Sequence, residues 1–146
     1  MKEDYKNLIE KIKSLLPASA ELIYLTYPKK EAAIIMADFD GDDAVELAVA
    51  YNIKNTPYIS ILKEIKCQWQ IVYTAQGKGY NLLYFKALNI SSDKYKDLVL
   101  GWQLEAQRAL LIICQWTGTE LKELSPPNLY YSKLDIEDMP SHKGCD

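Results

Sequence analysis

The chain has 146 residues, of which 49% are hydrophobic and 25% charged, and its formal net charge is −3. This length suits a single domain, residues 1–146, that can bury a core without disulfides. The acidic balance argues against a nucleic-acid partner, which would require a basic surface. No stretch approaches the roughly 20 apolar residues of a membrane-spanning helix, so we expect no transmembrane segment.

The first predicted element is an amphipathic helix over residues 4–16. Its apolar residues recur at three- and four-residue steps: Leu8, Ile9, Ile12, Leu15 and Leu16. Pro17 ends this pattern, because the residue before a proline is disfavoured in the helical conformation. We expect the apolar stripe to pack on the face or end of a sheet.

After the helix, short runs rich in β-branched and aromatic residues alternate with turn residues. This texture predicts a mainly β protein with antiparallel sheets and one N-terminal helix. The predicted strands are 21–25, 32–37, 46–51, 58–65, 69–75, 82–88, 97–102, 109–116, 121–124 and 130–136.

The strand pattern repeats along the chain. Residues 32–51 and 83–102 each read as strand, polar loop and strand, and a weaker copy begins at Tyr131. We therefore expect repeat one over about 20–75, repeat two over about 80–125, and the start of a degenerate third repeat over about 129–146. Such a period is typical of stacked β-units such as propeller blades.

These repeats are too few to close a propeller, which takes about four blades. An incomplete, blade-like arrangement must cover its apolar sheet faces with the helix, by sheet-on-sheet packing, or by self-association through the open faces. The third copy stops at Asp146, where the others begin a second strand. We therefore also expect either a fragment of a longer repeat protein or a frayed last segment.

The first polar loop, residues 38–46, carries five acids in nine residues. Carboxylates stand at positions 1, 3, 5 and 9 of this loop, and the carbonyl of the residue at position 7 can join them: Asp38, Asp40, Asp42, Glu46 and Ala44. Calcium takes six to eight oxygen ligands of this kind. Because these charges would repel one another without a cation, the loop predicts a calcium site.

The loop is not an EF-hand, which requires Gly at position 6 and Glu at position 12, where Asp43 and Val49 stand. From Ala37 through Val49 it resembles the calcium loop of FG-GAP and bacterial VCBS-type repeats, the blades of integrin-like β-propellers. The resemblance implies calcium held by the side chains of Asp38, Asp40, Asp42 and Glu46 and by the carbonyl of Ala44.

The later copies of this loop have lost ligands. The second matches the pattern only through Asn89, Ser91, Asp93 and Asp97, so it should hold calcium weakly or not at all. The third has Pro140 and His142 where ligands belong.

Two other functions are open. Asp38-Phe39-Asp40-Gly41 also resembles the first motif of haloacid-dehalogenase-like phosphatases, although Asp42 stands where that family has Thr and alternating βα units are missing. Eleven Tyr, three Trp and two Phe suit a carbohydrate-binding module if an aromatic cluster is exposed. With His142 as the one histidine and no partner for a nucleophile, we expect no enzyme but a non-catalytic binding or scaffold module, stabilised by calcium, for a protein or glycan partner.

Three cysteines without a C-x-x-C pair form no disulfide framework. We expect Cys67 and Cys114, both in apolar runs, to be buried free thiols. We expect Gly77-Lys78-Gly79 to form a hairpin turn. The first residues lack the apolar core of a secretory signal. The sequence leaves the location unknown: we expect an extracellular or cell-surface protein if an export segment was trimmed, and otherwise a cytoplasmic one.

Overall fold

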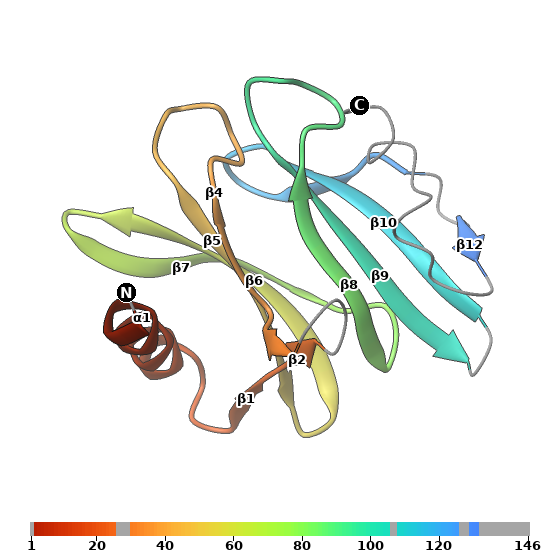
Figure 1. Cartoon of the computed structure of the whole chain (residues 1–146), viewed down its shortest axis with the longest axis horizontal. Helices are drawn as coiled ribbons and strands as arrows, with labels where there is room; N and C mark the ends of the chain where they lie inside the picture. Colours follow the sequence, from red (N-terminus) through yellow and green to blue (C-terminus); the bar gives the residue numbers. More distant parts are fainter. Residues whose placement is uncertain (1, 26–29, 106–107, 126–128, 132–146) are drawn as a thin grey trace.

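A computed structural model describes residues 2–25, 30–105, 108–125 and 129–131. One helix, α1 (Lys2–Leu15), precedes twelve strands in these ranges (Figure 1). The strands are β1 (Ala20–Leu22), β2 (Tyr24–Leu25), β3 (Glu31–Ala32), β4 (Ile34–Ala37), β5 (Glu46–Ile53), β6 (Thr56–Ile65), β7 (Gln68–Gln76), β8 (Asn81–Leu88), β9 (Asp97–Glu105), β10 (Arg108–Trp116), β11 (Leu121–Glu123) and β12 (Tyr130–Tyr131).

The strands form two five-stranded sheets and one small hairpin. The first sheet has the order β1-β5-β6-β7, with β4 also paired to β5, and the second has the order β11-β10-β9-β8, with β12 also paired to β10. The hairpin joins β2 to β3. Every pairing among the described residues is antiparallel. The prediction of a mainly β, antiparallel fold with one N-terminal helix is therefore confirmed.

Each large sheet contains a meander of four sequential strands, β4 to β7 in the first and β8 to β11 in the second. The first strand pair has the same register in both meanders: Ala37 lies opposite Glu46 in one, and Leu88 lies opposite Asp97 in the other. Glu46 and Asp97 therefore occupy equivalent positions at the start of β5 and β9.

The first sheet lies between α1 and the second sheet (Figure 1). Alternate residues of β5 point to opposite faces, so Leu47 and Val49 join Ile12 of α1 in one core, while Ala48 and Ala50 join the core shared with the second sheet. Because both of its faces are covered, β5 is buried along most of its length. This burial includes Glu46, its first residue. Helix and sheet packing cover these apolar faces as expected.

Two predicted strands are each divided in two. Residues 21–25 form β1 and β2, and residues 32–37 form β3 and β4. The breaks fall at Ile23 and Ala33, where the Ala33 N–H donates to the Ile23 carbonyl and the Ile23 N–H donates to the Ala50 carbonyl. β1 and β4 both pair with the same edge of β5, and between them the chain leaves that edge to form the β2–β3 hairpin. The alternation of side chains along the sequence does not show where a strand stops pairing with β5.

Two other predictions were wrong. Cys114 is buried as expected, but Cys67 is exposed, because Lys66 and Cys67 form the tight turn between β6 and β7 with φ of 52° and 67°. Gly77-Lys78-Gly79 connects β7 of one sheet to β8 of the other and is not a hairpin turn. A Cβ on Gly77 would lie 2.6 Å from the Trp102 ring, so this connection needs glycine for close packing.

Several predictions lie outside the described residues. They include most of the third repeat, with Pro140 and His142. No helix among the described residues is long and apolar enough to cross a membrane.

Candidate metal centre

Loop 1, residues 38–46, connects β4 to β5 and brings four carboxylates together. One oxygen from each of Asp38, Asp40, Asp42 and Glu46 lies within 4.8 Å of the others. Calcium ligands lie about 2.3–2.6 Å from the ion, so oxygens on opposite sides of it are about 5 Å apart. The spread of these oxygens therefore fits a single calcium coordination sphere.

Backbone N–H groups of loop 1 fix the orientation of its carboxylates. The Gly41 and Asp43 N–H groups donate to the two oxygens of Asp38 at 2.8 and 3.0 Å. The Asp42 N–H donates to Oδ1 of Asp40 at 3.3 Å, and the Ala44 N–H donates to Oδ1 of Asp42 at 2.9 Å. Oδ2 of Asp40 and of Asp42 therefore accepts no N–H group of loop 1.

Gly41 and Asp43 form the tight part of the bend, with φ of 79° and 67°. Asp43 is exposed and is not among the clustered carboxylates. Ala44, whose carbonyl is the fifth predicted ligand, is also exposed. The structure thus gathers the four predicted side chains and leaves the extra acid outside.

Glu46 is the most unusual member of the cluster, because its side chain is completely buried. Its Oε1 accepts the Phe39 N–H at 2.9 Å. Its Oε2 is buried and has no hydrogen-bond partner. An unsatisfied buried carboxylate oxygen is costly, and a cation would offset that cost.

The electrostatics of the cluster follow from this burial. Loss of hydration raises the pKa of Glu46 to about 7, and the nearby charges of Asp40 and Asp42 add to this rise, while its bond from Phe39 acts in the opposite direction. Burial also raises the pKa of Asp40. The Ala44 N–H instead lowers the pKa of Asp42.

A lysine from the neighbouring strand reaches loop 1. Nζ of Lys63, in β6, lies 3.1 Å from Oδ2 of Asp42 and 3.7 Å from Oδ2 of Asp40. Lys63 is opposite Glu46 in the β5–β6 pairing. Sequence reasoning missed this residue, and the signal that could have found it is the hairpin register that places Lys63 beside the end of loop 1.

Loop 2, residues 89–97, is the equivalent connection between β8 and β9 and satisfies its own polar groups. Oδ2 of the buried Asp97 accepts the Ile90 and Ser91 N–H groups, and the Ser91 hydroxyl reaches both Asp97 oxygens. Nζ of Lys96 donates to Oδ1 of Asn89 at 2.7 Å. Loop 2 therefore has neither an orphaned buried oxygen nor a cluster of acids among the described residues.

The two loops are in contact. The Lys96 N–H donates to the Asp38 carbonyl at 2.9 Å. A Cβ on Gly41 would lie 3.3 Å from the Tyr95 ring. A backbone hydrogen bond thus joins loop 1, which connects strands of the first sheet, to loop 2, which connects strands of the second.

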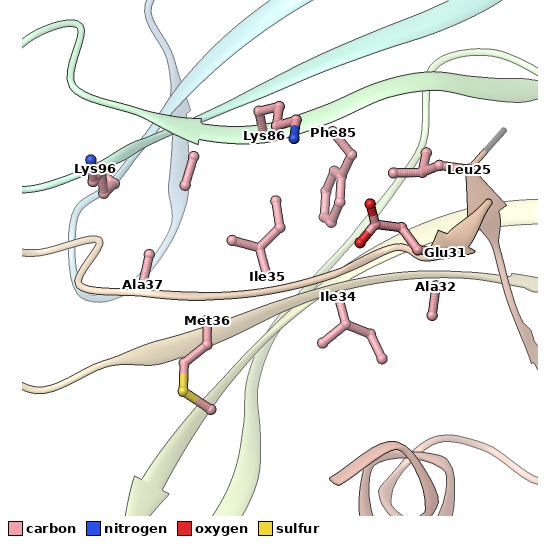
Figure 2. A pocket seen from close by; sticks show the side chains of 11 residues that line it. Leu25, Glu31, Ala32, Ile34, Ile35, Met36, Ala37, Phe85, Lys86 and Lys96 are labelled. Carbon is pink, nitrogen blue, oxygen red and sulfur yellow. The ribbon is translucent and has the colours of Figure 1, made fainter. Parts of the chain in front are cut away.

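A groove of about 410 Å³ lies beside the loops, between β4 and β8 (Figure 2). Figure 2 shows Ile35 and Phe85 pointing into it, whereas Ile34 and Met36 point to the other side of β4, although all four line it. Consecutive residues with opposite side-chain directions can line one groove only if the strand edge forms its wall. The lining residues are Leu25, Glu31, Ala32, Ile34, Ile35, Met36, Ala37, Phe85, Lys86, Ala87 and Lys96.

Comparison with profiles of known protein families, with curated proteins and with solved structures gave no match.

Proposed function

We propose that this protein is a non-catalytic binding module in which loop 1 holds calcium and the ion stabilises the junction of the two sheets. The observation that carries the proposal is Oε2 of Glu46, which is buried without a hydrogen-bond partner beside three further carboxylates. Asp97 supports it by contrast, since the residue at the equivalent place has every oxygen satisfied by the protein. A cation is the missing partner of Glu46.

Within this proposal the two four-stranded meanders are blade-like repeats of FG-GAP or VCBS type. Their matching register at Glu46 and Asp97 supports a repeat origin. Calcium would act as a structural ion that holds loop 1 in shape. The contact from Lys96 to Asp38 would carry that effect to the second sheet.

The first test is thermal unfolding of chelator-treated protein with and without calcium. Binding to the folded state alone stabilises it by about 2.7 kcal/mol when calcium exceeds Kd a hundredfold. Asp42→Asn should reduce the calcium-dependent rise in Tm, whereas Asp43→Asn, which removes one charge from the same loop outside the cluster, should preserve it. A Tm that is indifferent to calcium and chelator in the wild-type protein would contradict the proposal.

The groove is our candidate surface for the binding partner. β4 pairs only with β5 and β8 only with β9 among the described residues, so both present an unpaired edge to the groove. Lys86 lies on its wall and has no ion-pair partner in the described ranges. We propose an extended protein segment carrying a carboxylate, which could pair with a strand edge and with Lys86.

This partner can be tested with a random peptide library selected on the calcium-loaded protein. Selected peptides should be rich in Asp and Glu and should lose binding to Lys86→Glu. They should keep binding to Lys122→Glu, which makes the same charge change at an exposed position of β11. Equal binding to both variants would place the recognition surface elsewhere.

The two alternatives have less support. A carbohydrate-binding groove would expose an aromatic ring, but the one aromatic side chain that lines this groove, Phe85, is 2% exposed. A haloacid-dehalogenase-like phosphatase would require a parallel sheet built from alternating βα units, whereas the sheets among the described residues are antiparallel.

A further inference from the structure

Lys63 is the one side-chain cation within ion-pair distance of loop 1 among the described residues. Its ammonium contacts the Oδ2 atoms of Asp40 and Asp42, which are the oxygens that the loop N–H groups leave free. The ammonium therefore uses the same atoms that a bound cation would need. It does not contact Oε2 of Glu46, which stays without a partner.

The position of Lys63 is fixed by the fold. Its Cα lies opposite that of Glu46 in the β5–β6 pairing, so its flexible side chain starts beside the cluster. Its side chain is 34% exposed, which leaves it a path into solvent. In the β9–β10 pairing Cys114 lies opposite Leu98, so the register continues to Gln115 at Asp97, and this lysine has no counterpart in the second repeat.

We propose that Lys63 is a tethered counter-cation that competes with the divalent cation for Asp40 and Asp42. This inference rests on the proposed calcium site in loop 1. Without metal, the ammonium neutralises part of the acidic cluster. To bind, calcium must displace the ammonium, which moves into solvent on its flexible stem.

Two consequences follow from the competition. Lys63 lowers the affinity of loop 1 and so raises the calcium concentration at which the site fills. It also disfavours the binding of monovalent ions. The attraction of a singly charged ion to Asp40 and Asp42 is no stronger than that of the ammonium it would have to displace. Lys63 is thus a specificity-determining residue and not a ligand.

The test is isothermal titration of calcium into chelator-treated wild-type protein and four variants. Lys63→Met and Lys63→Gln remove the charge, while Lys63→Arg keeps it. Lys78→Met is the matched control, because Lys78 also forms an exposed ion pair, 3.6 Å from Glu123, and makes no ion pair with loop 1. Chelator-treated samples are first compared by circular dichroism to show that each variant is folded.

Removing the charge should tighten calcium binding about tenfold, since the lost competitor makes two ion contacts that are each modest at a partly exposed site. Lys63→Arg and Lys78→Met should bind as the wild type does. If the wild type binds but Lys63→Met and Lys63→Gln bind no more tightly, the competition is wrong and the calcium site stands. If neither the wild type nor these variants bind at millimolar calcium, both proposals fail. Binding by the uncharged variants alone would support the competition and contradict a calcium role for the wild-type protein.

Discussion

Glu46→Gln removes a charge that should destabilise the metal-free protein and should help to bind calcium. The substitution should therefore have opposite effects on stability without and with the ion. In metal-free protein, burial raises the pKa of Glu46 from 4.5 to about 7. At about 1.36 kcal/mol per pH unit, this corresponds to roughly 3 kcal/mol between the two protonation states. The amide introduced by the substitution would keep an oxygen for the Phe39 N–H and carry no charge.

The direction of the pH effect follows from which state binds the proton more tightly. The folded protein does so, because its Glu46 pKa is the higher one, so this residue lowers the free energy of unfolding as pH rises from about 4.5 to about 7. The loss should reach up to about 3 kcal/mol and level off above pH 7. The free energy of unfolding of metal-free Glu46→Gln should not show this loss. The variant should therefore become increasingly stable relative to the wild type as pH rises through this range, and it should be the more stable protein at pH 8.

Calcium should reverse this order. Wild-type protein at pH 8 gains stability from calcium, about 2.7 kcal/mol at a hundredfold excess over Kd, whereas Glu46→Gln lacks one charged ligand and gains far less. The assay is urea unfolding between pH 5 and 8.5 in chelator and in calcium, followed by the fluorescence of the buried Trp102 and Trp116. If the free energies of unfolding of the two proteins in chelator change equally with pH, burial does not raise the pKa of Glu46. If calcium stabilises both proteins equally, Glu46 is not a ligand.

Three further substitutions test the surrounding structure. Asp97→Asn should lower the free energy of unfolding by about 1–3 kcal/mol, because the buried carboxylate loses its charge-assisted hydrogen bonds. Stabilisation by calcium should remain, and its loss would show that loop 2 is part of the site. Gly77→Ala should cost about 1–3 kcal/mol in chemical denaturation, since its Cβ would meet the Trp102 ring at 2.6 Å, and an unchanged midpoint would contradict the close packing. Ile12→Ala should cost about 2–5 kcal/mol by removing the side chain of α1 that is 1% exposed, and a change below about 1 kcal/mol would mean that α1 does not cover the first sheet.

Local sequence patterns predicted most of the fold. The strands β5 to β10 carry dense β-branched and aromatic residues and lie within a few residues of their predicted bounds. The stripe that includes Ile12 predicted the helix and its packing. The breaks at Ile23 and Ala33 could not be predicted, because they arise from two strands competing for one edge of β5, which is a tertiary constraint.

The part of the candidate site that lies within one loop could be predicted from the sequence. The spacing of Asp38, Asp40 and Asp42 within one tight loop is visible in the sequence, and the structure gathers these side chains with Glu46. The contact from Lys63 could not be found in the loop, since it comes from another strand through the β5–β6 register. Cys67 was misjudged because Ile65 and Trp69 continue an alternating strand pattern across the two-residue turn at Lys66 and Cys67.

A crystal structure of the protein grown in millimolar calcium would show whether loop 1 holds the ion. We expect one ion in loop 1, with Oε2 of Glu46 among its ligands at about 2.3–2.6 Å, the Lys63 ammonium withdrawn from Asp42, and no ion in loop 2. A loop 1 without an ion under these conditions, with Lys63 still bonded to Asp42, would contradict the proposed calcium site.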